Sequence, residues 1–123
     1  MLKRGDQKLP RRGDVYLVNF DPAIGSEIKK TRPALVIQNN IANKHSPVVI
    51  VASISSFAGD AFYPTEVVIE LKEGGLDKRS LALMNQIKTI DKQRLISKLG
   101  SLKKETMLKV DSALEVSLGL IEI

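Results

Sequence analysis

The chain has 123 residues, of which 43% are hydrophobic and 27% charged, a balance typical of one globular domain and not of a disordered chain. It contains no cysteine and a single histidine. Disulfide scaffolds, thiolate catalysis, cysteine-ligated zinc and two-histidine ribonuclease chemistry are therefore excluded. No apolar run approaches the roughly 18 residues that cross a bilayer, and the basic N-terminus lacks the apolar segment of a signal peptide. A cytoplasmic protein with no membrane partner is expected.

Most of the net charge of +5 lies at the N-terminus. Residues 1–12 hold five basic residues against one acidic residue, whereas the remaining residues hold 14 basic against 13 acidic. We therefore predict a flexible basic lead-in over residues 1–11 and a single domain over residues 12–123. The domain itself is too close to neutral for its charge to indicate a nucleic-acid partner.

Six short segments have the composition of β-strands, and turn-forming residues separate them. They cover residues 15–20, 34–38, 48–55, 65–71, 81–90 and 96–99. No helical segment long enough for a parallel crossover lies between them. The pattern therefore predicts a mainly β protein, built as a small antiparallel barrel rather than as a doubly wound sheet.

The C-terminal segment has a different period. Its apolar residues step by three or four positions, which is typical of one buried stripe on a helix. The stripe consists of Met107, Val110, Leu114, Leu118 and Ile121. Ser101 is the expected N-cap of this helix, and Asp91 is expected to cap a short turn over residues 92–94. We expect the helix to cover the open end of the barrel.

The segment 25–33 joins the first two strands and is longer than a tight hairpin requires. Cations and hydroxyls are concentrated in it, and both form strong hydrogen bonds with phosphate oxygens. The candidate phosphate-binding residues are Gly25, Ser26, Lys29, Lys30, Thr31 and Arg32. Arg32 precedes Pro33, which favours an extended backbone and would aim a planar guanidinium into a cleft. The alternative interpretation is a solvated charged loop.

A second candidate is the end of the strand over residues 48–55. Alternation places Ser53 and Ser55 on one face of this strand and Ile54 on the other. Together with Ser56, these serines would offer hydroxyls to a phosphate at the mouth of the barrel. The alternative is ordinary turn chemistry at the end of a strand.

Other polar residues stand in less specific settings. Asn85 and Gln86 interrupt an apolar strand, where amides either satisfy buried backbone groups or read a base edge. His45 lies in the polar segment 43–47 and is expected at the surface. The sequence has no phosphate-loop glycine pattern, dinucleotide fingerprint or carboxylate cluster with metal-ligand spacing. Catalysis by this chain is therefore expected to need neither a metal ion nor a cofactor.

Seven blocks, taken together in their order, resemble one known family. They are residues 12–16 (RGDVY), 20–22 (FDP), 25–27 (GSE), 31–37 (TRPALVI), 50–55 (IVASIS), 64–67 (PTEV) and 85–91 (NQIKTID). In this order they are similar to the MazF/PemK (Kid) toxins, the endoribonucleases of toxin–antitoxin modules, and most similar to the Gram-positive branch. The resemblance extends from residue 12 to about residue 120, which is nearly the whole chain.

The resemblance implies an SH3-like barrel with a C-terminal helix, a homodimer and metal-independent cleavage of single-stranded RNA. In this family the 2′-hydroxyl attacks the adjacent phosphate and leaves a 2′,3′-cyclic phosphate and a 5′-hydroxyl end. The resemblance also implies a cognate antitoxin with an acidic, partly disordered tail, which would compete with RNA for the cations of the toxin.

The resemblance also assigns roles to individual residues. Arg32 matches the family arginine and would stabilise the charged phosphate, or donate a proton to the leaving oxygen, because an arginine stays protonated in proteins. Ser55 stands where the family has threonine, so the hydroxyl is kept but the β-branch that fixes its rotamer is lost. Glu27 matches the family glutamate and would orient Arg32 or accept the 2′-hydroxyl proton. The pair Lys29 and Lys30 makes the loop more cationic than in many relatives, which predicts salt-sensitive RNA binding.

Two alternatives from other functional classes stay open. One is a CcdB-like toxin that binds DNA gyrase without hydrolysis, although the pairing of residues 31–33 with Ser55 argues against it. The other is a non-catalytic SH3-like RNA-binding or adaptor module, which the aromatic content of 4% disfavours because such grooves use aromatic platforms. A catalytically decayed toxin is a further possibility if Ser55 does not replace threonine.

Overall fold

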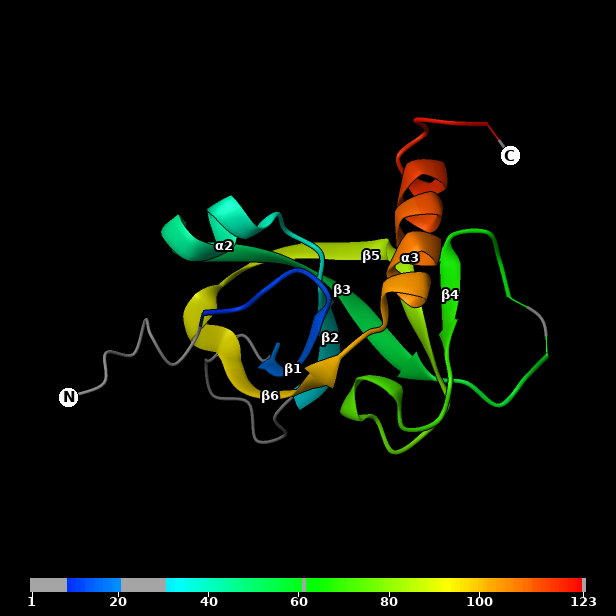
Figure 1. The fold of residues 1–123 in the computed structure, drawn as a ribbon, viewed down its shortest axis with the longest axis horizontal. Helices are drawn as coiled ribbons and strands as arrows, with labels where there is room; N and C mark the ends of the chain where they lie inside the picture. Colours follow the sequence, from blue (N-terminus) through cyan, green and yellow to red (C-terminus); the bar gives the residue numbers. More distant parts are fainter. Residues whose placement is uncertain (1–8, 21–30, 61, 123) are drawn as a thin grey trace.

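The structure of the chain is a computed structural model that describes residues 9–20, 31–60 and 62–122. The elements in chain order are β1 (Asp14–Asn19), β2 (Thr31–Val36), α2 (Asn40–His45), β3 (Val48–Ser56), β4 (Glu66–Ile69), η1 (Glu73–Gly75), β5 (Ser80–Asp91), η2 (Lys92–Arg94), β6 (Leu95–Ser101) and α3 (Lys104–Ser117). The six strands form an antiparallel sheet in the order β4-β5-β3-β2-β1-β6 (Figure 1). The prediction of a mainly β fold with a C-terminal helix is confirmed.

The sheet is not closed into a hydrogen-bonded barrel, because its edge strands β4 and β6 do not pair with each other. Instead, the turn η1 that follows β4 packs its backbone directly on β6. A Cβ atom at Gly75 would lie 1.9 Å from the carbonyl oxygen of Leu99, and one at Gly100 would lie 2.6 Å from the carbonyl carbon of Gly74. Only glycine permits this approach, so the expected barrel is completed by backbone packing rather than by a ladder.

Alternation along the strands places separate apolar clusters on the two faces of the sheet. The first cluster is covered by α3, which contributes Val110 and Ala113. Its buried sheet residues include Val15, Leu35, Ala52, Ile54, Val67, Ile69, Ala82 and Met84. The second cluster lies on the other face and consists of Tyr16, Val18, Ala34, Val36, Val49, Val51, Ile90 and Leu95, with Phe20 packed against it.

The expected start of the C-terminal helix is wrong. Ser101 is not its N-cap but the last residue of β6, and its hydroxyl donates to the buried carboxylate of Asp14 at 2.9 Å. The cap position is Lys103, whose backbone N–H donates to the Glu73 carboxylate at 3.0 Å. A carboxylate held at the first turn by another element therefore replaces a local side-chain cap.

The segment expected to be a polar loop at residues 43–47 is partly the short helix α2. Its N-cap is Asn39, whose side-chain oxygen accepts from the backbone N–H of Ala42 at 2.8 Å. The one buried residue of α2 is Asn43, which exchanges hydrogen bonds with Gln38. His45 is exposed, as expected, but it ends this helix rather than lying in a loop.

The expected lead-in is partly packed onto the domain. Pro10 of the lead-in is buried. Arg12, the first residue of the predicted domain, donates from its side chain to the carbonyl of Ile37 and pairs with Asp111 of α3, both at 2.8 Å. Residues 1–8 of the lead-in lie outside the described residues.

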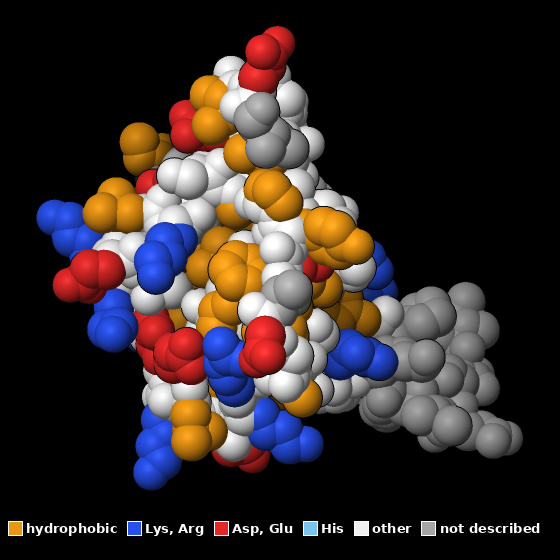
Figure 2. Space-filling model, turned by 90° about the vertical axis from the view of Figure 1, so that its right-hand side faces the viewer, with side chains coloured by type: hydrophobic (Ala, Val, Ile, Leu, Met, Phe, Trp, Pro, Cys, Tyr) orange, Lys and Arg blue, Asp and Glu red, His pale blue; other side chains and the backbone are white. Residues whose placement is uncertain are grey.

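An apolar groove of about 420 Å³ runs between α3, β4 and the segment before β4. Exposed apolar side chains gather on this side of the molecule (Figure 2). Two exposed large apolar side chains, Phe62 and Leu108, line the groove itself. Among the helices of the described residues, none is both long and apolar enough to span a membrane.

Candidate phosphate-binding site

A bulge in β5 shapes one wall of the candidate site. Opposite the neighbouring residues Ala52 and Ser53 of β3 stand Ile87 and Leu83, so residues 84–86 of β5 have no partner in that ladder. A bulge of this kind bends the strand and re-aims its side chains. Asn85 and Gln86 are consequently exposed rather than buried in the strand.

The backbone of the bulge is held from two sides. The N–H of Met84 donates to the carbonyl of Thr65 at 2.9 Å, and the hydroxyl of Ser117 in α3 donates to the carbonyl of Met84 at 2.8 Å. Because Met84 is itself fully buried, these bonds satisfy backbone groups that the interrupted ladder leaves free. The last turn of α3 therefore supports the bulge.

On the second face of the sheet, apolar side chains are followed by polar side chains along the strands. On β3 the buried Val49 and Val51 are followed on the same face by Ser53 and Ser55. Register places Arg32 on this face through its pairing with Val18. In the same way Lys88 shares the face through its pairing with Val51. The apolar cluster thus gives way to polar side chains from three neighbouring strands.

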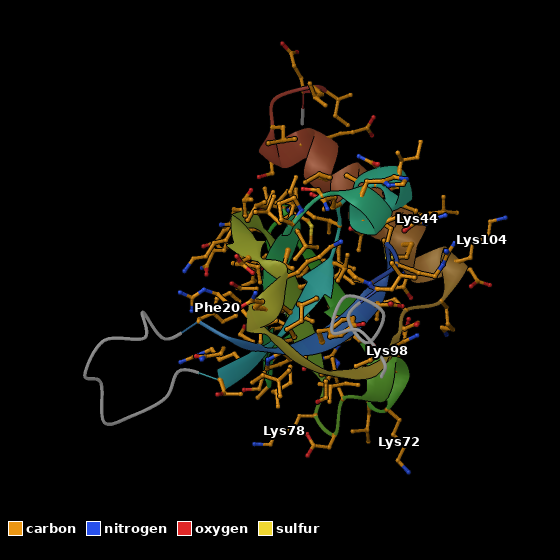
Figure 3. The ribbon with its side chains drawn as sticks, turned by 90° about the vertical axis from the view of Figure 1, so that its left-hand side faces the viewer. Phe20, Lys44, Lys72, Lys78, Lys98 and Lys104 are labelled. Carbon is orange, nitrogen blue, oxygen red and sulfur yellow. The ribbon has the colours of Figure 1, made fainter. Side chains whose placement is uncertain are left out.

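These side chains line an open depression of about 290 Å³. Its lining residues are Phe20, Arg32, Ser53, Ser55, Leu83, Gln86 and Lys88. Phe20 lies where β1 ends, on the opposite side of the molecule from Lys44 and Lys104 (Figure 3). The depression therefore combines two cations, two hydroxyls and one amide with an aromatic wall.

The charges at the depression have one sign. Among the described residues, Arg32 and Lys88 form no ion pair, whereas Arg12, Arg79 and Lys98 each contact a carboxylate. None of the described lining residues is a carboxylate or a histidine. The described part of the site can therefore bind and stabilise an oxyanion such as a phosphate, but it supplies no general base.

The structure brings together four of the residues that the sequence singled out: Arg32, Ser53, Ser55 and Gln86. Thr31, Ser56 and Asn85 are exposed near the depression but do not line it. The candidates that lie outside the described residues are Gly25, Ser26, Glu27, Lys29 and Lys30.

Sequence reasoning missed Phe20, Leu83 and Lys88. The signals were present, since Phe20 ends a strand beside the cationic segment and Lys88 interrupts an apolar strand two residues after Gln86. Neither signal indicates that these side chains lie on the same face of the sheet as Arg32 and Ser55, because that depends on the pairing of β5 with β3.

Among the described residues, the two groups whose pKa is shifted, Tyr16 and Lys92, do not line the depression. Burial, with a smaller contribution from the Asp14 carboxylate, raises the pKa of Tyr16, and burial lowers the pKa of Lys92, whose ammonium donates to the carbonyl of Asn43. Within the described ranges no cluster of three or more histidine, aspartate or glutamate side chains is placed to hold a metal ion.

Fold and site together define a small, mainly β protein with a cationic depression on the face of its sheet that carries the second apolar cluster. Comparison with known proteins identifies the family. Residues 11–118 match the family described as "PemK-like, MazF-like toxin of type II toxin-antitoxin system". The match covers more than half of the chain, so the chain belongs to the PemK-like, MazF-like toxins, and the family resemblance seen in the sequence is confirmed.

Individual relatives agree with this assignment. The chain is 51% identical to "Endoribonuclease MazF" of Staphylococcus epidermidis over 89% of this chain and 92% of the relative. It is 49% identical to "Endoribonuclease EndoA" of Bacillus subtilis (strain 168) over 91% of this chain and 97% of the relative. A solved structure, "Endoribonuclease in complex with its cognate antitoxin from Mycobacterial species", superimposes with a TM-score of 0.73 at 28% identity, covering 93% of this chain and 99% of that one.

Proposed function

We propose that this chain is the toxin of a toxin–antitoxin module and acts as a sequence-specific, metal-independent endoribonuclease on single-stranded RNA. Two relatives are named endoribonucleases, and each is about 50% identical to this chain over nearly its whole length. The observation that carries the proposal within this chain is the shared depression of Arg32 and Ser55, which come from different strands.

The chemistry proposed for this depression is an internal phosphoryl transfer. The 2′-oxygen of one ribose forms a bond to the adjacent phosphorus, and the bond from phosphorus to the 5′-oxygen of the next nucleotide breaks. The products are a 2′,3′-cyclic phosphate and a 5′-hydroxyl end. Negative charge grows on the phosphate in the transition state, where the Arg32 guanidinium and the Ser55 hydroxyl would stabilise it.

Two protons must move in this reaction. The 2′-hydroxyl loses one as it attacks, and the 5′-oxygen gains one as it leaves. A guanidinium carries donors and no acceptor, so Arg32 is assigned to charge stabilisation, with proton donation to the leaving oxygen as its alternative role. Glu27, which lies outside the described residues, is proposed to orient Arg32 or to accept the 2′-hydroxyl proton.

Base recognition is proposed for the bulge of β5. The amides of Asn85 and Gln86 carry both donors and acceptors, so they can read the edge of an unpaired base. In a duplex the Watson–Crick edges are occupied by pairing and the bases cannot be splayed out onto the protein, which favours a single-stranded substrate. Phosphate contacts are proposed for Ser53, Ser56 and Thr31, together with the cationic segment over residues 25–30.

The proposed partners follow the family. A homodimer is proposed, and the exposed apolar side chains around α3 offer such a dimer a surface to bury. A cognate antitoxin with an acidic, partly disordered tail is proposed to compete with RNA for Arg32 and its neighbouring cations. With cellular RNA as substrate, the proposed location is the cytoplasm. Sedimentation at micromolar concentration should show the dimer, and a clean monomer would contradict it.

A cleavage assay tests the proposed function. Mixed-sequence single-stranded RNA is incubated in EDTA with wild type, with Arg32→Ala and with Arg11→Ala as an exposed arginine control. Wild type and the control should give the same discrete fragments, and Arg32→Ala should give none. RNA left intact by all three proteins would reject the proposal and direct attention to gyrase binding or to a non-catalytic RNA-binding module.

A further inference from the structure

Lys88 occupies a position in the site that the roles assigned above do not explain. It lies on β5, on the face that carries the serines of β3, and it lines the same depression as Arg32 and Ser55. It is exposed, and no described carboxylate pairs with it. A solvated lysine that lines a depression already containing a guanidinium adds a second positive charge to it.

The direction of the Lys88 side chain is also restricted. Its ammonium lies over the ring of Phe20, 5.3 Å from the ring centroid. A cation at this distance is attracted to the negative face of the ring. Phe20 itself is packed against the second apolar cluster, so its ring has a fixed support. An aromatic anchor of this kind limits the rotamers of a long side chain before any ligand binds.

The order of the strands separates the two cations. Arg32 is on β2, Lys88 is on β5, and β3 with Ser53 and Ser55 lies between them. Neighbouring strands are about 4.8 Å apart, so the backbones of β2 and β5 are about 10 Å apart. Register offsets the two cations further, because Lys88 pairs with Val51 and Val51 pairs with Val36, four residues from Arg32. This spacing suits two successive phosphates of one RNA chain better than a single phosphate held by both cations.

We propose that Lys88 binds a backbone phosphate next to the one that is cleaved, and that Phe20 is the positioning residue for Lys88. This inference rests on the proposed ribonuclease function, because it assigns a substrate contact to the same site. A contact with a neighbouring phosphate is made equally in the ground state and in the transition state. It therefore lowers KM and leaves kcat unchanged, whereas Arg32 acts on kcat.

The test compares Lys88→Gln, Lys88→Arg and Phe20→Leu with Lys104→Gln, a lysine on the other side of the molecule (Figure 3). Cleavage kinetics on one RNA give kcat and KM at several salt concentrations. Fluorescence anisotropy with a 2′-O-methylated RNA, which cannot be cleaved, gives Kd over the same range. Matching circular dichroism spectra and Tm values confirm that each variant is folded.

Lys88→Gln should raise KM and Kd roughly tenfold at low salt, the effect of one charge-assisted hydrogen bond, with kcat unchanged. The slope of log Kd against log salt should fall by about 0.7, the value for one lost contact with a single strand. Lys88→Arg should restore most of the affinity, Phe20→Leu should fall between Lys88→Gln and wild type, and Lys104→Gln should match wild type.

Equal KM and Kd for Lys88→Gln and Lys104→Gln would overturn the assignment, as would a loss confined to kcat. The anisotropy measurement of binding separates this inference from the proposed function. If wild type binds RNA without cutting it, and Lys88→Gln still weakens binding with the smaller slope, Lys88 remains a phosphate contact and only the ribonuclease activity is rejected. If wild type neither binds nor cuts RNA, both are rejected.

Discussion

The backbone contact between η1 and β6 makes a sharp prediction about two glycines. Gly75 and Gly119 have nearly the same positive φ, 75° and 74°. An alanine at either position carries the same cost of a left-handed backbone, about 1–2 kcal/mol. The two sites differ in their surroundings, because a Cβ at Gly75 would lie 1.9 Å from the Leu99 carbonyl oxygen and one at Gly119 would meet nothing within 4 Å.

Gly75→Ala should therefore cost about 3 kcal/mol more than Gly119→Ala in free energy of unfolding, since a rigid carbonyl oxygen must shift to admit the methyl group. Urea denaturation monitored by circular dichroism measures both variants against wild type. A loss of this size is a large part of the stability of a domain of this length. Equal losses for the two variants would refute the close backbone contact that completes the curved sheet.

Three further predictions concern the site and its support. Ser55→Ala should lower kcat about 100-fold because it removes a donor to the reacting phosphate, whereas Ser55→Thr should remain active. Equal kcat for Ser55→Ala and wild type would contradict this role. Ser117→Ala removes a hydrogen bond to the β5 bulge, so it should lower the free energy of unfolding by about 1 kcal/mol and make the enzyme accept a wider set of cleavage motifs. Ser112→Ala on the same helix should do neither. Urea denaturation measures the stability, and sequencing of the fragments measures the motif. Burial first and Asp14 second raise the pKa of Tyr16 above its ordinary 10.0, so the stability that this group contributes is present below pH 10 and is lost as pH rises through the raised pKa. Tyr16→Phe should therefore lose less stability than wild type in denaturation series between pH 9 and 11, and parallel losses would refute this cause.

The strands could be predicted because their composition and boundaries are local signals. The apolar, β-branched run at residues 48–55 is β3 almost to the residue. The bulge at residues 84–86 could not be predicted, because it depends on how β5 pairs with β3 on either side of it and on the β4 ladder ending at Leu83. The short helix α2 was missed because its one buried residue, Asn43, is polar and gives no hydrophobic period.

The end of the C-terminal helix shows how a local signal can outweigh a periodic one. Leu118 and Ile121 continue the spacing of the stripe, yet both are exposed and lie beyond the last helical residue, Ser117. Gly119 adopts a positive φ, and the N–H of Leu120 donates back to a carbonyl of the final turns. This is the usual glycine termination of a helix, so the apolar stripe is packed only as far as Leu114.

The candidate site was predictable in its chemistry and not in its full membership. Arg32 stood out because it ends a cationic segment just before Pro33, Ser55 stood out through strand alternation, and a family motif pointed to both. Phe20 and Lys88 belong to the same depression only through long-range register, which a single sequence does not specify. Long-range pairing therefore adds the second cation and its aromatic support.

The central claim is that this chain cleaves RNA through the 2′-hydroxyl, using the Arg32 and Ser55 depression and no metal ion. Mass spectrometry of the fragments produced in EDTA tests it most directly. We predict upstream fragments that carry a 2′,3′-cyclic phosphate, downstream fragments with a 5′-hydroxyl, and no cleavage when the nucleotide at the cut site is 2′-deoxy. Fragments with 5′-phosphate ends, or cleavage of the deoxy-substituted RNA, would contradict the account.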